Sequence, residues 1–119
     1  MKTTENKVIL RGRLGKDPEV RPLETDRSVA NTSIATPETY KKDGEYVTDT
    51  QWHNLVFWGE QASFAELNLK KGMLVHIEGK LTHRSYIDKN NITRYVSEVV
   101  VKTAYEVKEA EPEEPAQAD

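Results

Sequence analysis

Both tryptophans of the chain, Trp52 and Trp58, lie in the stretch 50–59. Their β-branched and aromatic neighbours predict a strand, in which side chains alternate between two sides. Leu55 and Phe57 would then face a core, and the two indoles would share the opposite side, where polar groups are usual. Because an indole offers a flat π-face, this spacing favours a platform on which planar ligands stack. The alternative is a strand buried on both sides, as at the centre of a sandwich.

Cationic and aromatic side chains also share one side of a second stretch, 73–86. A strand there would place Lys80, Arg84 and Tyr86 on the same side. Interleaved cations and rings suit a track that contacts both phosphates and bases. The alternative is an ordinary solvated surface.

Residues that enzymes and metal sites need are absent or badly spaced in this sequence. The chain has no cysteine, no Gly-x-Ser-x-Gly elbow and no Walker loop. Its three histidines, His53, His76 and His83, are too far apart for a recognisable metal-ligand spacing. We therefore expect a binding protein rather than an enzyme, with no metal and no cofactor.

The formal charge of -3 hides an uneven distribution of charged residues. Residues 109–119 hold five of the 20 acidic side chains and none of the 17 Lys and Arg, so residues 1–108 carry +2. This weak positive charge gives at most a slight preference for phosphate. The acidic stretch 108–119 contains Pro112 and Pro115 and no large apolar residue, so we expect a disordered tail after one domain at 1–107.

No apolar run approaches the roughly 18 residues of a membrane span, and residues 1–6 contain no apolar leader segment. The absence of cysteine is compatible with a reducing compartment. We therefore expect a cytoplasmic protein that has no membrane partner.

Apolar periodicity and turn residues predict five strands and one short helix. Gly12 interrupts the first strand as a barrel bend would, and Asp43-Gly44 and the stretch 88–91 mark hairpin turns. After Gly59 the period becomes helical, and Gly72 is the expected end of the helix. The predicted strands are 6–14, 27–40, 50–59, 73–86 and 92–107, with a short extended piece at 20–22.

This order of elements is typical of an OB fold, an all-β, five-stranded Greek-key barrel with one short helix between strands 3 and 4. Other small barrels, such as SH3-like ones, usually lack a helix at that position. OB barrels bind oligonucleotides on their central strands and in their loops.

At this point many short segments, in order, resemble one family, the bacterial single-stranded DNA-binding proteins. The similarity covers about residues 6–102. The matching segments are Asn6-Lys7-Val8-Ile9-Leu10, Gly12, residues 14–21, Val29-Ala30-Asn31, Trp52-His53, Lys71-Gly72, residues 77–81, Arg94-Tyr95 and residues 98–101.

The resemblance implies an OB fold, a homotetramer built from dimers of barrels, and sequence-tolerant wrapping of single-stranded DNA. His53 matches a family histidine associated with the subunit interface. All four positions of the family's base-stacking residues are aromatic here, and four of its cationic positions are retained. The stacking positions are Tyr40, Trp52, Trp58 and Tyr86, and the cationic positions are Lys7, Lys71, Arg84 and Arg94.

Other positions depart from the family pattern. Asn54, Glu60 and Thr82 stand where members often have a cation, which predicts weaker phosphate neutralisation and a shallower salt dependence than in a typical member. Family members generally end in an acidic tip closed by a Pro-Phe pair that recruits replication and repair proteins. The sequence ends instead at residues 116–119 without that pair, so recruitment of such partners is not expected.

We therefore expect sequence-independent binding and protection of single-stranded DNA in replication, repair and recombination, in the cytoplasm and associated with the nucleoid. The expected contacts combine stacking with Lys and Arg contacts to phosphates, including Lys80 on the strand of Arg84. One alternative is an RNA-binding or primosome-type OB protein. Another is an OB oligomerisation scaffold whose aromatic residues bury against a protein partner.

Overall fold

The computed structural model describes residues 3–23 and 27–108 of the chain. The expected tail at 108–119 therefore lies almost wholly outside the described residues. The elements, in chain order, are β1 (Val8–Leu14), β2 (Glu19–Pro22), β3 (Ser28–Lys42), β4 (Glu45–Trp58), α1 (Glu60–Asn68), β5 (Leu74–Ile87) and β6 (Thr93–Glu106).

Five of the strands close a barrel. The sheet order is β1-β5-β6-β4-β3, and β1 also pairs with β3 at Arg13 and Leu14, which closes the sheet on itself. The β4–β6 pairing is parallel and the other pairings are antiparallel. The extended piece expected at 20–22 is β2, which pairs along the outer edge of β3. This arrangement agrees with the predicted five-stranded barrel with a helix before its last two strands.

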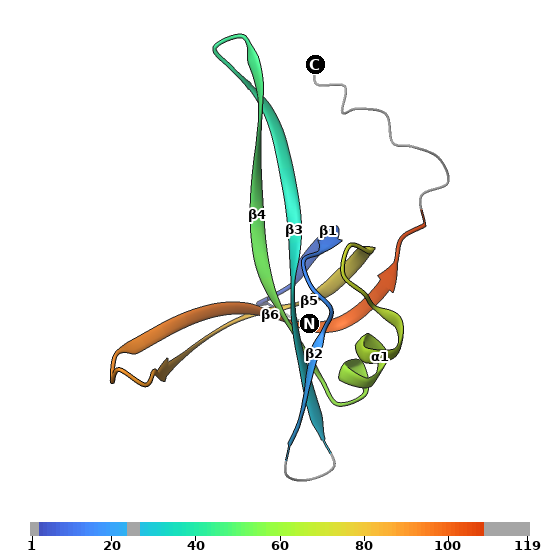
Figure 1. Ribbon diagram of the computed structural model, residues 1–119, viewed down its shortest axis with the longest axis vertical. Coiled ribbons are helices and arrows are strands. Elements are labelled where there is room, and N and C mark those ends of the chain that lie inside the picture. Colours follow the sequence, from blue (N-terminus) through green and yellow to red (C-terminus); the bar gives the residue numbers. More distant parts are fainter. Residues whose placement is uncertain (1–2, 24–26, 109–119) are drawn as a thin grey trace.

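Two long hairpins project from the barrel in different directions (Figure 1). The β3–β4 pairing continues without a break from Val29–Trp58 to Lys42–Glu45. Asp43 and Gly44 form the turn with φ of 51° and 82°, as an Asp-Gly hairpin requires. The β5–β6 pairing likewise continues to Ile87–Thr93. We call residues 36–51 the β3–β4 arm and residues 82–97 the β5–β6 arm. Strand β4 begins at Glu45, five residues before the predicted start at residue 50.

The core fills the inside of the barrel, and α1 covers one end of it. Ala62 and Ala65 of α1 are buried with Phe57, and Leu69 completes the predicted apolar stripe. The helix ends at Asn68, so the expected stop at Gly72 is wrong by one turn. Gly72 instead takes a φ of 86° in the following turn, where its N–H donates to the Leu14 carbonyl.

Two glycines allow strands to approach closely where the barrel bends. A Cβ on Gly12 would lie 2.0 Å from the carbonyl oxygen of Ala35, and a Cβ on Gly79 would lie 2.1 Å from that of Val100. Gly12 is therefore the predicted barrel bend, at the point where β1 passes from β5 to β3. Gly79 lies at the one register shift of the β5–β6 pairing.

Candidate nucleic-acid interface

The strand register brings the outward side chains of β4 and β5 onto one surface. Residues opposite each other in a sheet share a side. Val56 lies opposite Val100, which in turn lies opposite Lys80. Side chains alternate along each strand, so the even-numbered positions of both strands face the same way. We call this surface the aromatic face; it comprises Trp52, Asn54 and Trp58 of β4 and Lys80, Thr82, Arg84 and Tyr86 of β5.

Both indoles are open to solvent on the aromatic face. Trp52 is 60% exposed and Trp58 is 48% exposed, whereas Leu55 and Phe57 are buried in the core. The predicted sorting of this strand is thus confirmed, and burial of the two indoles within one chain is excluded. A Cβ on Gly15 would lie 2.5 Å from Cζ3 of Trp52, so the indole rests against this glycine. The protein supports part of the ring and leaves the remaining π-surface open to a ligand.

Tyr40 does not share this surface with Trp52. Its opposite residue is Val47, whereas Trp52 lies opposite Ala35, so the register places the two rings on opposite sides of the hairpin. Neighbouring strands were expected to bring Tyr40 and Tyr86 to the surface of the two indoles, and for Tyr40 this is wrong, because odd positions of β3 lie opposite even positions of β4. The Tyr40 hydroxyl donates a 3.0 Å hydrogen bond to Asp49, which raises the pKa of Tyr40.

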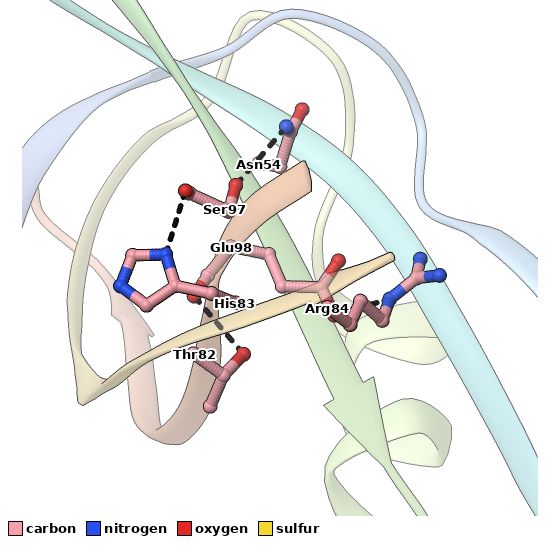
Figure 2. A network of polar contacts seen from close by, with 6 residues as sticks. All are labelled: Asn54, Thr82, His83, Arg84, Ser97 and Glu98. Carbon is pink, nitrogen blue, oxygen red and sulfur yellow. Dashed lines mark hydrogen bonds and ion pairs between the residues drawn. The ribbon is translucent and has the colours of Figure 1, made fainter. Parts of the chain in front are cut away.

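Arg84 is paired with a buried carboxylate. Its Nε–H donates to Oε2 of Glu98 over 3.0 Å, and only 8% of the Glu98 side chain is exposed. The same guanidinium lies 6.0 Å from the ring centroid of Tyr86. Figure 2 shows the side chains of Arg84 and His83 extending in opposite directions, with the Glu98 carboxylate beside Arg84. Ion pairing with Glu98 raises the pKa of Arg84.

Two polar side chains of the aromatic face, at positions where the resemblance led us to expect a cation, hydrogen-bond to the backbone of β6. Asn54 donates its Nδ2–H to the Ser97 carbonyl at 3.3 Å, and the Thr82 hydroxyl donates to the Glu98 carbonyl at 3.3 Å (Figure 2). Both side chains therefore stabilise the strand that carries Glu98. Neither brings a positive charge to the aromatic face.

Arg94 is engaged at the turn of the β5–β6 arm. Its Nε–H donates to Asp88 over 2.8 Å. The other oxygen of Asp88 accepts hydrogen bonds from the N–H groups of Asn90 and Ile92. Arg94 thus stabilises a turn, and this pairing competes with any contact to phosphate.

Acidification is expected to loosen this turn. The hydrogen bonds from Arg94, Ile92 and Asn90 hold the pKa of Asp88 below its ordinary value of 3.8. A lowered pKa means that the carboxylate stabilises the turn above the ordinary Asp range and that this is lost as pH falls through the lowered value. An NMR titration of the Asn90 and Ile92 amides should show a midpoint below 3.8, and Asp88→Asn should remove the transition. A midpoint at or above 3.8 would contradict this reading.

The lysines differ in their distance from the aromatic face. Lys80 is exposed on it. Lys71 follows α1 and is exposed, and its backbone N–H donates to Asp17, two residues after the Gly15 that contacts Trp52. Lys7 lies elsewhere, in an open hollow of about 550 Å³ that Glu78 also lines.

His53 lies on the side opposite the indoles, as the alternation predicted. It is half-buried, and its Nε2 lies 2.8 Å from the Thr36 hydroxyl oxygen. This position is where the β3–β4 arm leaves the barrel. The assignment of His53 to a subunit interface stays a prediction.

A separate polar cluster lies on β1, β5 and β6. His76 stacks on Tyr105 with ring centroids 4.9 Å apart, and its two ring nitrogens contact Arg11 at 3.2 Å and Glu78 at 2.9 Å. The hydrogen bond from His76 holds the pKa of Glu78 below its usual range, and the charge of Lys7 acts in the same direction. This cluster was not predicted from the sequence, where its members are scattered.

Within residues 3–23 and 27–108, no three His, Cys, Asp or Glu side chains gather as metal ligands. In the same part of the chain, no helix is long and apolar enough to cross a membrane. The aromatic face, on which both indoles are exposed, is the candidate ligand surface.

Comparison with known proteins bears on what that ligand is. The model of the single-strand binding protein family matches residues 5–107. The chain belongs to this family. Membership agrees with the expectation of a DNA-binding protein rather than an enzyme, and with the resemblance found in the sequence.

Two relatives of this chain come from Neisseria meningitidis, one from serogroup A and one from serogroup B. Each is a single-stranded DNA-binding protein that is 45% identical over 96 residues, covering 80% of this chain and 55% of the relative. The chain thus spans about half the length of these relatives. A solved complex of a Plasmodium falciparum SSB with ssDNA has the same fold, with a TM-score of 0.79 at 25% identity, and covers 91% of this chain and 99% of that one. The OB fold is thereby confirmed.

Proposed function

We propose that this chain binds single-stranded DNA without sequence preference and protects it during replication, repair and recombination. The exposure of both Trp52 and Trp58 on one surface carries the proposal, because base stacking accepts any base. The similarity to an SSB solved in complex with ssDNA supports it. Because single-stranded DNA forms on the chromosome, this function implies a cytoplasmic protein that associates with the nucleoid.

We assign stacking to Trp52, Trp58 and Tyr86, which share the aromatic face, and phosphate contacts to Lys80 and Lys71. These residues combine flat rings with cations that carry no carboxylate partner among the described residues. Tyr40 would stack separately, on the β3–β4 arm. Lys7 and Arg94 are remaining candidates for phosphate, although Arg94 would first have to leave Asp88.

A fluorescence titration tests this function. Oligo-dT should strongly quench tryptophan emission, because both indoles are exposed and would stack on bases. Increasing the salt concentration should weaken binding, since phosphate contacts release counterions. Saturating oligo-dT that leaves the emission unchanged would overturn the platform.

The same titration separates the two alternatives. An RNA oligonucleotide of equal length that displaces oligo-dT at equal concentration would favour the RNA-binding alternative. An oligomer that buries its indoles before any ligand is added, and that oligo-dT does not disturb, would favour the scaffold. Light scattering with and without oligo-dT provides the mass that this comparison needs.

We also propose assembly into a homotetramer. Strand β1 pairs with β5 from Val8 to Arg13 but meets β3 only at Arg13 and Leu14. Within the described residues, the other edge of Val8–Gly12 therefore has no partner strand, and such an edge can accept a strand from a second copy. His53, at the base of the β3–β4 arm, is the assigned interface residue. The light-scattering mass of the free protein should equal four chains.

A further inference from the structure

Glu98 is an unusual residue for a surface that binds a polyanion. It projects from β6 onto the aromatic face, at the level of Thr82 on β5. Its side chain is 8% exposed, so its charge is held close to the protein interior. A buried carboxylate is unfavourable unless a hydrogen-bonded cation compensates it. Arg84 is that cation, at 3.0 Å.

This pairing changes what Arg84 can offer to DNA. The buried Glu98 carboxylate already balances the charge of the guanidinium, so contact with a phosphate would neutralise little net charge and release few counterions. Its Nε–H is occupied, but the side chain is 55% exposed, which leaves its terminal NH₂ groups accessible. Those groups are planar hydrogen-bond donors whose direction Glu98 fixes.

The neighbouring ring indicates which part of the nucleotide Arg84 meets. Its guanidinium lies 6.0 Å from the centroid of Tyr86, within the range of a cation–π contact. A base that stacks on Tyr86 would bring its carbonyl oxygens and ring nitrogens, which accept hydrogen bonds, beside these donors. A flat guanidinium can also stack on the base itself.

We propose that Glu98 is a positioning residue that holds Arg84 as a charge-balanced donor for a nucleobase beside Tyr86, so that Arg84 contacts a base and not a phosphate. This inference rests on the proposed binding of single-stranded DNA. Lys80 provides the contrast. It lies four residues earlier on the same side of β5 and has no ion pair among residues 3–23 and 27–108.

The test measures affinity against salt concentration for two ligands, oligo-dT and an abasic oligonucleotide of equal length that keeps every phosphate. Four variants are compared with the unchanged protein: Arg84→Lys, Glu98→Gln, the double variant Arg84→Gln/Glu98→Gln, and Lys80→Gln as the control for a phosphate contact. The double variant removes both charges together and so leaves no buried charge unpaired. Thermal unfolding checks that each variant is folded.

Arg84→Lys should weaken oligo-dT binding roughly 5- to 10-fold, because the charge stays but the planar donor is lost. Its binding of the abasic ligand should not change. Glu98→Gln should make the salt slope steeper by about 0.7, the value for one more neutralised phosphate on a single strand. The double variant should keep the slope of the unchanged protein, whereas Lys80→Gln should lower it by about 0.7.

Two results would overturn the inference. One is an Arg84→Lys variant that binds both ligands normally, together with a shallower slope for the double variant, which would make Arg84 an ordinary phosphate contact. The other is a set of Arg84 variants with no effect on either ligand, which would place Arg84 outside the interface. Failure of the unchanged protein to bind oligo-dT would instead reject the proposed function itself.

Discussion

Replacing Trp52 with alanine should weaken oligo-dT binding by about 1–3 kcal/mol, or roughly 5- to 150-fold, and Trp58→Ala should have an effect of the same size. Each ring is about half exposed or more, so its removal takes away stacking surface while the core stays intact. The two positions are six residues apart on one strand, roughly 20 Å. Effects at such a distance usually add, so the double variant should lose roughly 2–6 kcal/mol. Fluorescence anisotropy of labelled oligo-dT measures these changes.

Tyr105→Ala provides the matched control. This ring is exposed to nearly the same degree as Trp58, but it stacks on His76, in the part of β5 that precedes the register shift at Gly79, and it is not one of the residues of the aromatic face. Its removal should leave oligo-dT affinity unchanged. If the tryptophan variants bind as well as Tyr105→Ala does, the aromatic face is not where bases stack.

Gly12→Ala should cost about 3 kcal/mol of unfolding free energy or more, out of the roughly 5–15 kcal/mol typical of a domain. The added methyl group would meet the carbonyl oxygen of Ala35 at 2.0 Å. This obstacle is backbone and cannot rotate away, so β1 and β3 would have to separate where they close the barrel. The thermal midpoint should fall by more than about 10 °C.

Gly44→Ala makes the same chemical change in open space. A Cβ at this position would meet nothing within 4 Å, although the φ of 82° imposes backbone strain. The cost should be about 1–2 kcal/mol. Equal losses for the two variants would show that close approach at Gly12 does not limit the stability of the barrel.

Local patterns in the sequence were enough to predict several features of this molecule. Alternation along 50–59 separated the exposed indoles from Leu55 and Phe57, and Asp43-Gly44 located one hairpin turn. These features depend on neighbours in the chain, so the sequence contains the information directly.

Features that depend on register could not be predicted in this way. The side on which Tyr40 lies depends on which residue of β4 it opposes. The pairing of Arg84 with Glu98 depends on the alignment of β5 and β6 across the irregularity at Gly79. The partner of Arg84 was therefore missed. Asp88, the partner of Arg94, was missed although it lies only six residues away, and both arginines were expected to be simple phosphate contacts.

The closure of the barrel also constrains how the chain folds. The two arms pair residues that are close in sequence, whereas β1 must find β5, as in the contact of Arg11 with His76, 65 residues later. Contacts between distant residues form slowly because a long loop must close first. During synthesis, β3 and β4 can pair once both have left the ribosome, whereas β1 must wait for β5. Closure of the barrel must follow synthesis of both β5 and β6, because β6 joins β5 to β4, and until then apolar residues of β1 and β4 are exposed to aggregation.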